Sequence, residues 1–209
     1  MKIKAELLKP YNEQEKINFI VEQNHKLGYI IEEQEDKLVA LGYTEQEKLK
    51  QEKERIALLN MTGADVERAI YKVKGIDFDD ILAMVKNNPA IDEKALKIEF
   101  KANNFFRGNP YISQVGLLLG FTEDMLDNFF KTKDYHYLSK YTLEVHPTPS
   151  EAVITINGEI TNKITLPYNT EVEYTASLDN YVTQTGKLNL AENKVIEIEL
   201  QPETPITQE

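Results

Sequence analysis

Histidine and serine are the first side chains to consider for metal binding or catalysis, and the chain has three histidines. His25, His136 and His146 have no metal-ligand spacing, because none has a second histidine three or four residues away. No serine lies in the Gly-x-Ser-x-Gly pattern that positions a hydrolase nucleophile. These patterns predict solvated or structural histidines and no serine hydrolase.

Two other segments resemble fragments of binding motifs. The three aspartates within Asp77–Asp80 match half of a calcium loop, but Leu82 and Asn88 stand where that loop needs Gly and Glu. We interpret these acids as the first residues of a helix. Gly116–Gly120 is followed by Phe and Thr rather than by Lys and Ser or Thr, which predicts a close-packed helix ending at glycine and no phosphate loop. We therefore predict no enzyme, no metal and no cofactor.

The segment Phe105–Ile112, FFRGNPYI, has the most distinctive chemistry in the chain. Its arginine can form a forked ion pair with a carboxylate. Two hypotheses stay open: a structural turn between helices, or an edge that docks a partner. A small bundle of short helices has little room for so many aromatic rings, so we expect part of them in an interface. The predicted interaction residues are Phe105, Phe106, Arg107, Tyr111, Phe121, Phe129 and Phe130.

Composition limits the classes of partner. The net charge is -11. Cysteine is absent, which excludes disulfides, thiolate metal sites and cysteine nucleophiles. Lys and Arg are interleaved with Glu throughout, so nucleic acid is not an expected partner. No apolar run approaches the roughly 18 residues that span a bilayer, and the first residues lack a signal-peptide pattern. We expect no membrane partner and synthesis in the cytoplasm.

The elements that position these residues change character near residue 138. Apolar residues recur with helical spacing up to Phe130, and from Thr142 onward they alternate with period two. The predicted fold class is a multi-domain α + β protein, with a protease-sensitive junction between Lys131 and Tyr141. Its predicted parts are a small α+β unit (1–43), a polar connecting helix (44–60), a helical bundle (61–137), an all-β immunoglobulin-like sandwich (138–201) and a disordered tail (202–209).

The N-terminal unit is predicted to contain two strands and two helices. A strand ends before Pro10, and a helix over Glu13–Leu27 ends at Gly28. The second strand is expected over residues 29–31, and a short helix is expected over residues 36–41. Such a small unit has little core of its own.

A capping-box pattern, Thr44 with Glu47, begins the connecting helix, for which a partner-helix surface is the alternative interpretation. Thr62 and Thr122 are the expected N-caps of two of the helices that follow. The five expected helices run over residues 62 or 64–74, 78–87, 92–106, 110–119 and 123–130.

From Thr142 onward, the alternation of apolar residues predicts seven short strands. This number of short strands is typical of a β-sandwich. Asn157–Gly158 is the strongest hairpin-turn pair, although the polar residues after it allow a longer loop. The apolar strand positions are Leu143 and Val145; Ile154 and Ile156; Ile164 and Leu166; Val172, Tyr174 and Ala176; Val182; Leu188 and Leu190; and Ile196, Ile198 and Leu200.

The run PTPSEAVITINGEITNKITLPYNTEVEYTASLDNYVTQTGKL is similar to PEGA-type and related bacterial immunoglobulin-like domains. The sequence departs from their pattern at Asn169-Thr170, where such domains often have Gly, and at Asn180. The resemblance implies a spacer or adhesive module without catalytic residues. The matching residues are Pro149, Ala152, Ile154, Ile156, Asn157, Gly158, Val172, Tyr174 and Tyr181.

Residues 1–131 resemble small, mostly uncharacterised proteins encoded near the tail-fibre and baseplate genes of phages and prophages of Firmicutes. Three stretches carry the likeness: KPYNEQEKINFIVEQNHKLGYIIEE, LGYTEQEKLKQEKERIALLNMTGADVERAIY and FKANNFFRGNPYISQVGLLLGFTEDMLDNFF. The resemblance implies a phage or prophage product, present in the host cytoplasm during assembly and then in the tail region of the virion.

We therefore predict a non-enzymatic structural or accessory protein of the tail region. Its helical part would dock to other phage structural proteins in an oligomeric assembly, and its β module would be displayed. Two alternatives stay open. The first is a module that binds a glycan or protein of the host surface, and the second is an assembly chaperone absent from the mature particle.

Overall fold

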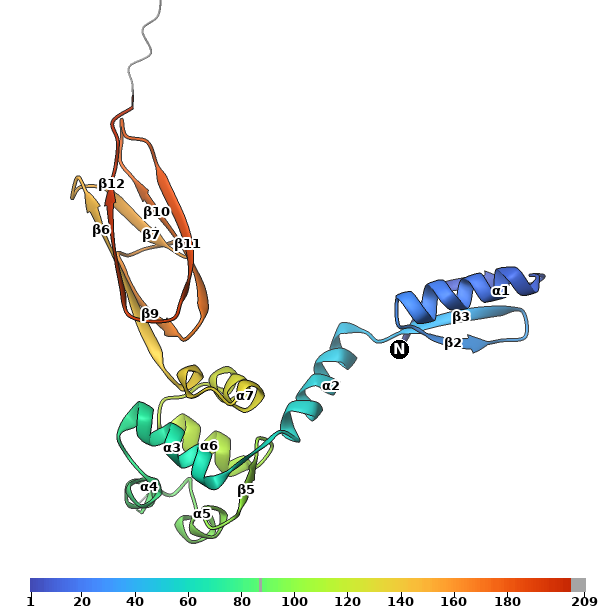
Figure 1. Cartoon of the computed structure of the whole chain (residues 1–209), viewed down its shortest axis with the longest axis horizontal. Coiled ribbons are helices and arrows are strands. Elements are labelled where there is room, and N and C mark those ends of the chain that lie inside the picture. Colours follow the sequence, from blue (N-terminus) through green and yellow to red (C-terminus); the bar gives the residue numbers. More distant parts are fainter. Residues whose placement is uncertain (87, 204–209) are drawn as a thin grey trace, which may run out of the picture. The chain divides into compact units, whose positions relative to one another are not determined.

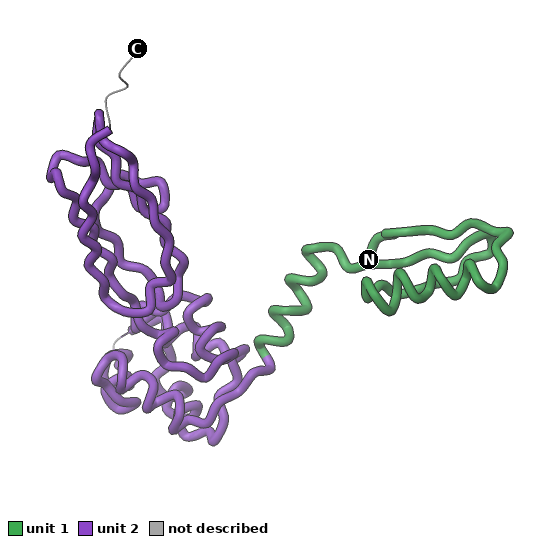
Figure 2. Tube along the Cα trace, turned by 45° about the horizontal axis from the view of Figure 1, so that its top comes forward, with its two compact units in different colours: residues 1–57 green, residues 58–209 purple. Residues whose placement is uncertain are grey.

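The computed structural model describes residues 1–86 and 88–203 and divides the chain into two compact units, residues 1–57 and 58–209 (Figure 2). Helices and sheets are both present, as the sequence predicted (Figure 1). The predicted boundary after residue 137 lies inside the second unit. Asn87, the predicted end of one helix, and residues 204–209 of the predicted tail lie outside the described residues.

Unit 1 is a three-stranded antiparallel sheet with a helix, followed by a second helix. The strand order is β1-β3-β2. The predicted helix over residues 13–27 is confirmed, although its second half is π-helical. The elements are β1 (Lys2–Leu8), α1 (Glu13–Ile20), the π-helical η1 (Val21–Lys26), β2 (Ile30–Glu33), β3 (Lys37–Gly42) and α2 (Glu45–Ala57).

Local hydrogen bonds explain where these helices begin and end. Asn12 accepts a hydrogen bond from the backbone N–H of Glu15 at 2.9 Å, and the Glu15 carboxylate accepts one from the N–H of Asn12 at 2.8 Å. Gly28 follows with a φ of 71°, which glycine adopts without strain. Thr44 and Glu47 form the predicted capping box at the start of α2.

The predicted short helix over residues 36–41 is wrong, because these residues form β3, the central strand of the sheet. Leu38, Val39 and Ala40 are consecutive and buried. A short continuous apolar run fits a strand covered on both sides as well as a buried helix, so local spacing could not decide between them. Unit 1 therefore has three strands where the sequence predicted two.

The first part of unit 2 is a bundle of short helices with a two-stranded ribbon. Thr62 and Thr122 are N-caps as predicted, and Gly75 ends α3 with a φ of 71°. The elements are β4 (Asn60–Thr62), α3 (Gly63–Lys74), α4 (Phe78–Val85), α5 (Glu93–Glu99), β5 (Asn104–Phe106), α6 (Pro110–Leu118), α7 (Glu123–Thr132) and the 3-10 helix η2 (Tyr135–Leu138).

The helix predicted over residues 92–106 is too long. It ends at Glu99, and Asn104–Phe106 instead pairs antiparallel with Asn60–Thr62. Met61 and Phe105 lie opposite each other and both enter the core, so the ribbon joins two distant segments of the chain. No local pattern in either three-residue strand indicated this pairing.

The second part of unit 2 consists of two sheets that share one apolar core. One sheet has the order β11-β10-β7-β8 and the other β12-β6-β9. Buried residues of the shared core come from both sheets, including Ile156 of β7 and Leu143 of β6. The strands are β6 (Lys140–Thr148), β7 (Val153–Ile156), β8 (Glu159–Ile160), β9 (Lys163–Pro167), β10 (Thr170–Ser177), β11 (Gln184–Leu190) and β12 (Lys194–Glu199).

Six of the seven predicted strands are confirmed, and the one proposed at Val182 is wrong. The N–H of Val182 donates to the carbonyl of Gln201 at 2.8 Å, in a connection outside the named strands. Asn157–Gly158 is a two-residue turn with φ values of 52° and 83°, and it leads directly into β8. The short strand β8 was not predicted.

The segment between Lys131 and Tyr141 is packed rather than open. Its 3-10 helix contributes Leu138, which is 2% exposed, to the core of the bundle. The N–H of Tyr168 donates to the carbonyl of Ser139 at 3.0 Å, and the Tyr168 ring contacts Tyr137 edge to face at 5.0 Å. These contacts connect the helical part of unit 2 to its sheets.

Candidate interaction surface

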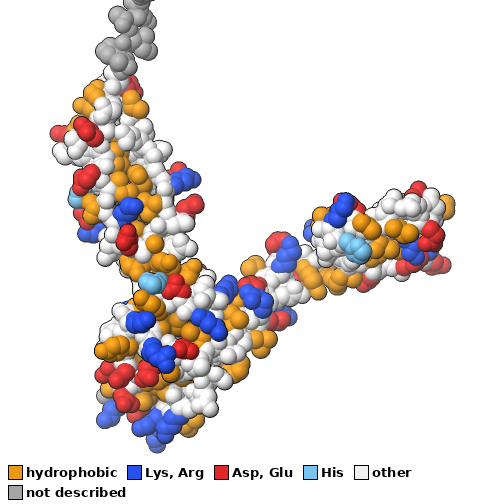
Figure 3. All heavy atoms as spheres, in the orientation of Figure 1, with side chains coloured by type: hydrophobic (Ala, Val, Ile, Leu, Met, Phe, Trp, Pro, Cys, Tyr) orange, Lys and Arg blue, Asp and Glu red, His pale blue; other side chains and the backbone are white. Residues whose placement is uncertain are grey.

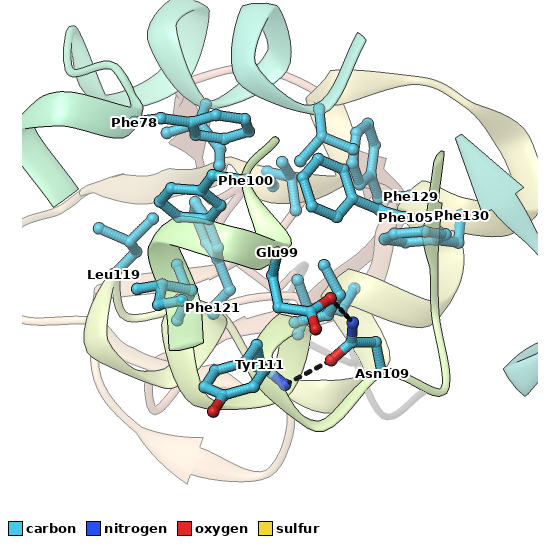
Figure 4. Close-up of a pocket in the computed structure, with 18 residues that line it drawn as sticks. Phe78, Glu99, Phe100, Phe105, Asn109, Tyr111, Leu119, Phe121, Phe129 and Phe130 are labelled. Carbon is cyan, nitrogen blue, oxygen red and sulfur yellow. Dashed lines mark hydrogen bonds between the residues drawn. The ribbon is translucent and has the colours of Figure 1, made fainter. Parts of the chain in front are cut away.

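The seven predicted interaction residues occupy different environments. Phe105, Phe121, Phe129 and Phe130 are at most 3% exposed and form the centre of the bundle core (Figure 4). Tyr111 is half-buried, and Phe106 is 49% exposed on the outer side of the β4–β5 ribbon. The bundle therefore buries more aromatic surface than the sequence suggested, because Phe78 and Phe100 stack with centroids 4.1 Å apart and Phe105 packs edge-on against both rings.

Arg107 is a structural residue of the turn after β5. Its guanidinium pairs with Glu123, donates to the hydroxyl of Ser113 at 3.1 Å, and has Nε 2.7 Å from Asp127 Oδ1, in an ion pair without hydrogen-bond geometry. Partial burial acts to raise the pKa of Glu123, but hydrogen bonds from Arg107 and Ser113 bring that pKa below its usual value. This arrangement supports the structural-turn hypothesis for Arg107.

A small cavity lies inside the bundle core. It has a volume of about 30 Å³ and an almost entirely apolar lining, with Glu99 and Asn109 hydrogen-bonded at 2.6 Å among its lining residues (Figure 4). A space of this size holds about one water molecule. It is therefore a packing defect, too small for a cofactor or substrate.

The other motif fragments have structural roles. Asp77 caps α4 by accepting from the N–H of Asp80 at 2.9 Å, which confirms that it is a helix N-terminal acid. A Cβ on Gly116 would lie 2.5 Å from Leu126 Cδ1, which confirms the close-packed helix. Among residues 1–86 and 88–203, no group of three His, Cys, Asp or Glu side chains could hold a metal ion. In the same residues, no helix has the length and apolar character that crossing a bilayer requires.

The sheet of unit 1 has one face covered by α1. Residues that lie opposite each other on neighbouring strands point to the same face, so Leu38 shares a face with Leu7 and Glu33. The Glu33 carboxylate accepts hydrogen bonds from Tyr11 at 3.0 Å and from Lys16 at 2.9 Å. Lys16 belongs to the first turn of α1 and Tyr11 directly precedes its N-cap Asn12, so α1 covers the Leu38 face.

The opposite face carries an apolar row that crosses all three strands. Leu41 lies between Ile3 and Ile30, which are 47% and 41% exposed. We call Ile3, Leu41 and Ile30 the open-face row. Beside it, Glu6 and Glu32 flank the buried Val39, and Glu6 pairs with Lys37 at 3.0 Å. The open face thus combines an apolar end with a charged end.

The first 43 residues of unit 1 leave more large apolar side chains exposed than they bury. Within residues 1–43 the buried apolar side chains are Leu38, Val39 and Ala40. Figure 3 shows apolar side chains at the surface of this unit between groups of charged ones. The sequence did not reveal this surface, because assigning the faces requires β3 as a strand. The exposed large apolar residues are Met1, Ile3, Leu8, Ile17, Val21, Leu27, Ile30 and Tyr43.

Comparison with known proteins adds no assignment: no family model, no curated protein and no solved structure matches this chain.

Proposed function

We propose that this chain is a non-enzymatic structural or accessory protein of the tail region of a phage or prophage. It attaches to other structural proteins of an oligomeric assembly through its N-terminal residues. The open-face row of unit 1 is the observation that carries the attachment. The resemblance of residues 1–131 to tail-region proteins supports the biological setting, including a location in the host cytoplasm and then in the virion.

The surface of attachment within residues 1–137 is assigned to unit 1 rather than to the aromatic cluster. Four of the seven predicted interaction residues are part of the bundle core and have little surface to offer a partner. Burying the exposed halves of Ile3 and Ile30 contributes on the order of 1 kcal/mol each, and the remaining exposed apolar residues extend that surface. A partner would supply the second apolar layer that this sheet lacks.

The two-sheet part is proposed to be an immunoglobulin-like sandwich that is displayed outward. Two sheets that share one core of alternating residues support this proposal. Asn169 and Asn180 have φ values of 60° and 65°. Asn tolerates this left-handed conformation better than most residues, which explains how the sequence can depart from glycine at position 169. The exposed faces of β10 and β12 carry Glu171, Glu173, Glu197 and Glu199.

Association of the full-length chain with tail complexes of its source phage tests this function. The double variant Ile3→Thr with Ile30→Thr keeps β-branched side chains but removes apolar surface from the row. We expect at least tenfold weaker co-sedimentation with tail complexes. Ile160→Thr, at an 81% exposed position of β8, is the matched control and should bind normally.

Two results would change the assignment. Equal binding by the double variant and the control would remove the open-face row from the attachment surface. A chain that binds unassembled tail proteins but is missing from purified particles would favour the assembly-chaperone hypothesis.

A further inference from the structure

Unit 2 contains an open cleft between helix α7 and the turn that joins β9 to β10. Its volume is about 650 Å³, within the roughly 300–1,000 Å³ range of small-molecule sites. Asp124, Asp127 and Asn128 of α7 line one side. Tyr137 of η2, with Tyr168 and Asn169 of the turn, lines the other. The cleft is separate from the open-face row of unit 1.

The walls of this cleft are held by internal contacts. Tyr168 is fixed through its backbone to Ser139 and through its ring to Tyr137, as described above. The N–H of Asn169 donates to the carbonyl of Leu190 at 2.8 Å, and the hydroxyl of Thr170 donates to the carbonyl of Pro167 at 2.7 Å. A ligand would therefore meet a preformed surface and would lose little affinity to ordering it.

The lining of the cleft carries one surplus negative charge. Its charged residues are Asp124, Asp127 and Lys131. The buried guanidinium of Arg107 lies 2.7 Å from Asp127 but also pairs with Glu123, so it does not neutralise both carboxylates. The surplus charge disfavours an anionic ligand. A single charge on an open surface is screened by salt and attracts a cation only weakly, so an uncharged ligand suits the cleft.

The remaining polar groups suit a ligand with several hydroxyls. Within the described residues, the side chains of Asn128 and Asn169 make no hydrogen bond to the protein. Each amide offers a donor and an acceptor in one plane, which matches two adjacent hydroxyl groups. The phenol rings of Tyr137 and Tyr168 supply apolar surface and a hydroxyl each, and the apolar C–H face of a sugar ring can pack against such a surface.

We propose that this cleft binds a neutral saccharide unit, with Asn128 and Asn169 hydrogen-bonding its hydroxyls and the two tyrosines contacting its ring. The site does not rest on the proposed tail function, because all of its lining residues belong to unit 2. A monosaccharide that makes these contacts would bind with a dissociation constant in the millimolar range.

Titration of the full-length chain with glucose, galactose, mannose and N-acetylglucosamine, followed by backbone amide NMR, tests the proposal. At least one of these sugars should give saturable shifts confined to residues 122–131, Tyr137 and residues 167–170. Glucuronate, which adds a negative charge to the same ring, should bind no more tightly than glucose. Absence of saturable shifts with all four sugars up to 100 mM, or stronger binding of glucuronate, would overturn the proposal.

Two variants test the assigned contacts. Asn169→Gly removes the amide and retains a residue suited to the φ of 60°, and Asn128→Ala removes the amide on α7. Each should weaken binding at least fivefold. Asn180→Gly is the matched control, because it makes the same change at a φ of 65° outside the cleft, and it should bind normally. Unchanged affinity in both cleft variants would contradict the assigned contacts.

Discussion

The sheet of unit 1 and the paired sheets of unit 2 differ in how completely their apolar faces are covered. Within residues 1–43 three apolar side chains are buried, all on β3, whereas the shared core of the two sheets in unit 2 buries ten. In unit 2 each sheet covers the apolar face of the other. In unit 1 the short helix α1 covers one face, and the other face retains the open-face row.

Because of this difference, the apolar residues of the two regions contribute to different free energies, those of the closed core to folding and those of the open face to binding a partner. Apolar residues that close a core within the chain contribute to the folding free energy whether or not a partner is bound. Apolar residues left on a surface contribute only when a partner removes them from water. We therefore expect substitutions in the two-sheet core to change unfolding, and substitutions in the open-face row to change binding.

The largest expected effect comes from truncating the two-sheet core. Ile156→Ala removes a fully buried side chain from β7 and should lower the free energy of unfolding of this part by about 2–5 kcal/mol. Ile30→Ala on the open face should cost less than about 1 kcal/mol, because its side chain is 41% exposed. Urea titrations followed by amide NMR signals of each unit measure both values. Similar losses at the two positions would remove the contrast between the units.

The second effect concerns the turn that joins β7 to β8. Gly158 has a φ of 83° and open space around its Cα, so a Cβ there would meet backbone strain and no clash. Gly158→Val should destabilise the two-sheet part by about 1–3 kcal/mol and leave the signals of unit 1 unchanged. Gly158→Asn is the control, since asparagine tolerates a positive φ better than valine and no atom lies near the added Cβ. An unchanged urea midpoint in Gly158→Val would show that the turn tolerates a β-branched residue.

Much of the fold was predictable because its signals are local. Capping residues such as Thr44, Thr62 and Thr122 bond to backbone groups within three residues, so their types alone indicate where helices begin. The alternation in β6, β7 and β10 likewise follows from the two faces of a strand. The turn at Asn157–Gly158 was predictable for the same reason.

The errors occurred where distant residues decide the structure. Residues 37–42 are a strand because β1 and β2 pair with them on both sides, and no local pattern specified those partners. The burial of Phe129 and Phe130 depends on helices that come from the whole bundle. The open-face row and the cleft beside Tyr168 are consequences of such long-range placement. The sequence therefore indicated the elements better than it indicated the candidate sites.

Limited trypsin digestion should distinguish helix α2 from the segment between Lys131 and Tyr141. The expected difference in cleavage rate is local and smaller than the effects above. The lysines and the arginine of α2 lie on an exposed helix in which Ile56 is the buried residue, so cleavage should begin there. The bonds after Lys131 and Lys133 should resist longer, because Leu138 and Tyr137 hold the following segment against the bundle and Tyr168. Mass spectrometry of early fragments distinguishes the two sites. First cleavage between residues 131 and 141 would restore the original prediction of an exposed junction.

The smallest expected effect is a pH dependence on the outer face of the sheet formed by β12, β6 and β9. His146 Nε2 lies 3.0 Å from Glu144 and Nδ1 lies 3.0 Å from Glu197, while Lys163 pairs with Glu144 at 2.9 Å. The hydrogen bond with Glu144, followed by the charge of Glu197, raises the pKa of His146 above its ordinary value of 6.5. A raised pKa in the folded state means that protonated His146 stabilises the fold.

That contribution is fully present below the unfolded-state pKa and is lost as the pH rises through the folded-state pKa. Because the imidazole is 45% exposed, solvent screens the pair and the change in stability should be small. Between pH 5.5 and 8 the urea midpoint of the two-sheet part should fall slightly in the wild type, and less in His146→Gln, which cannot gain the charge. An imidazole titration by NMR gives the pKa directly. A midpoint below 6.5 would mean that the two carboxylates do not hold the proton, and that outer-face charges contribute no more to this sheet than exposed ion pairs usually do.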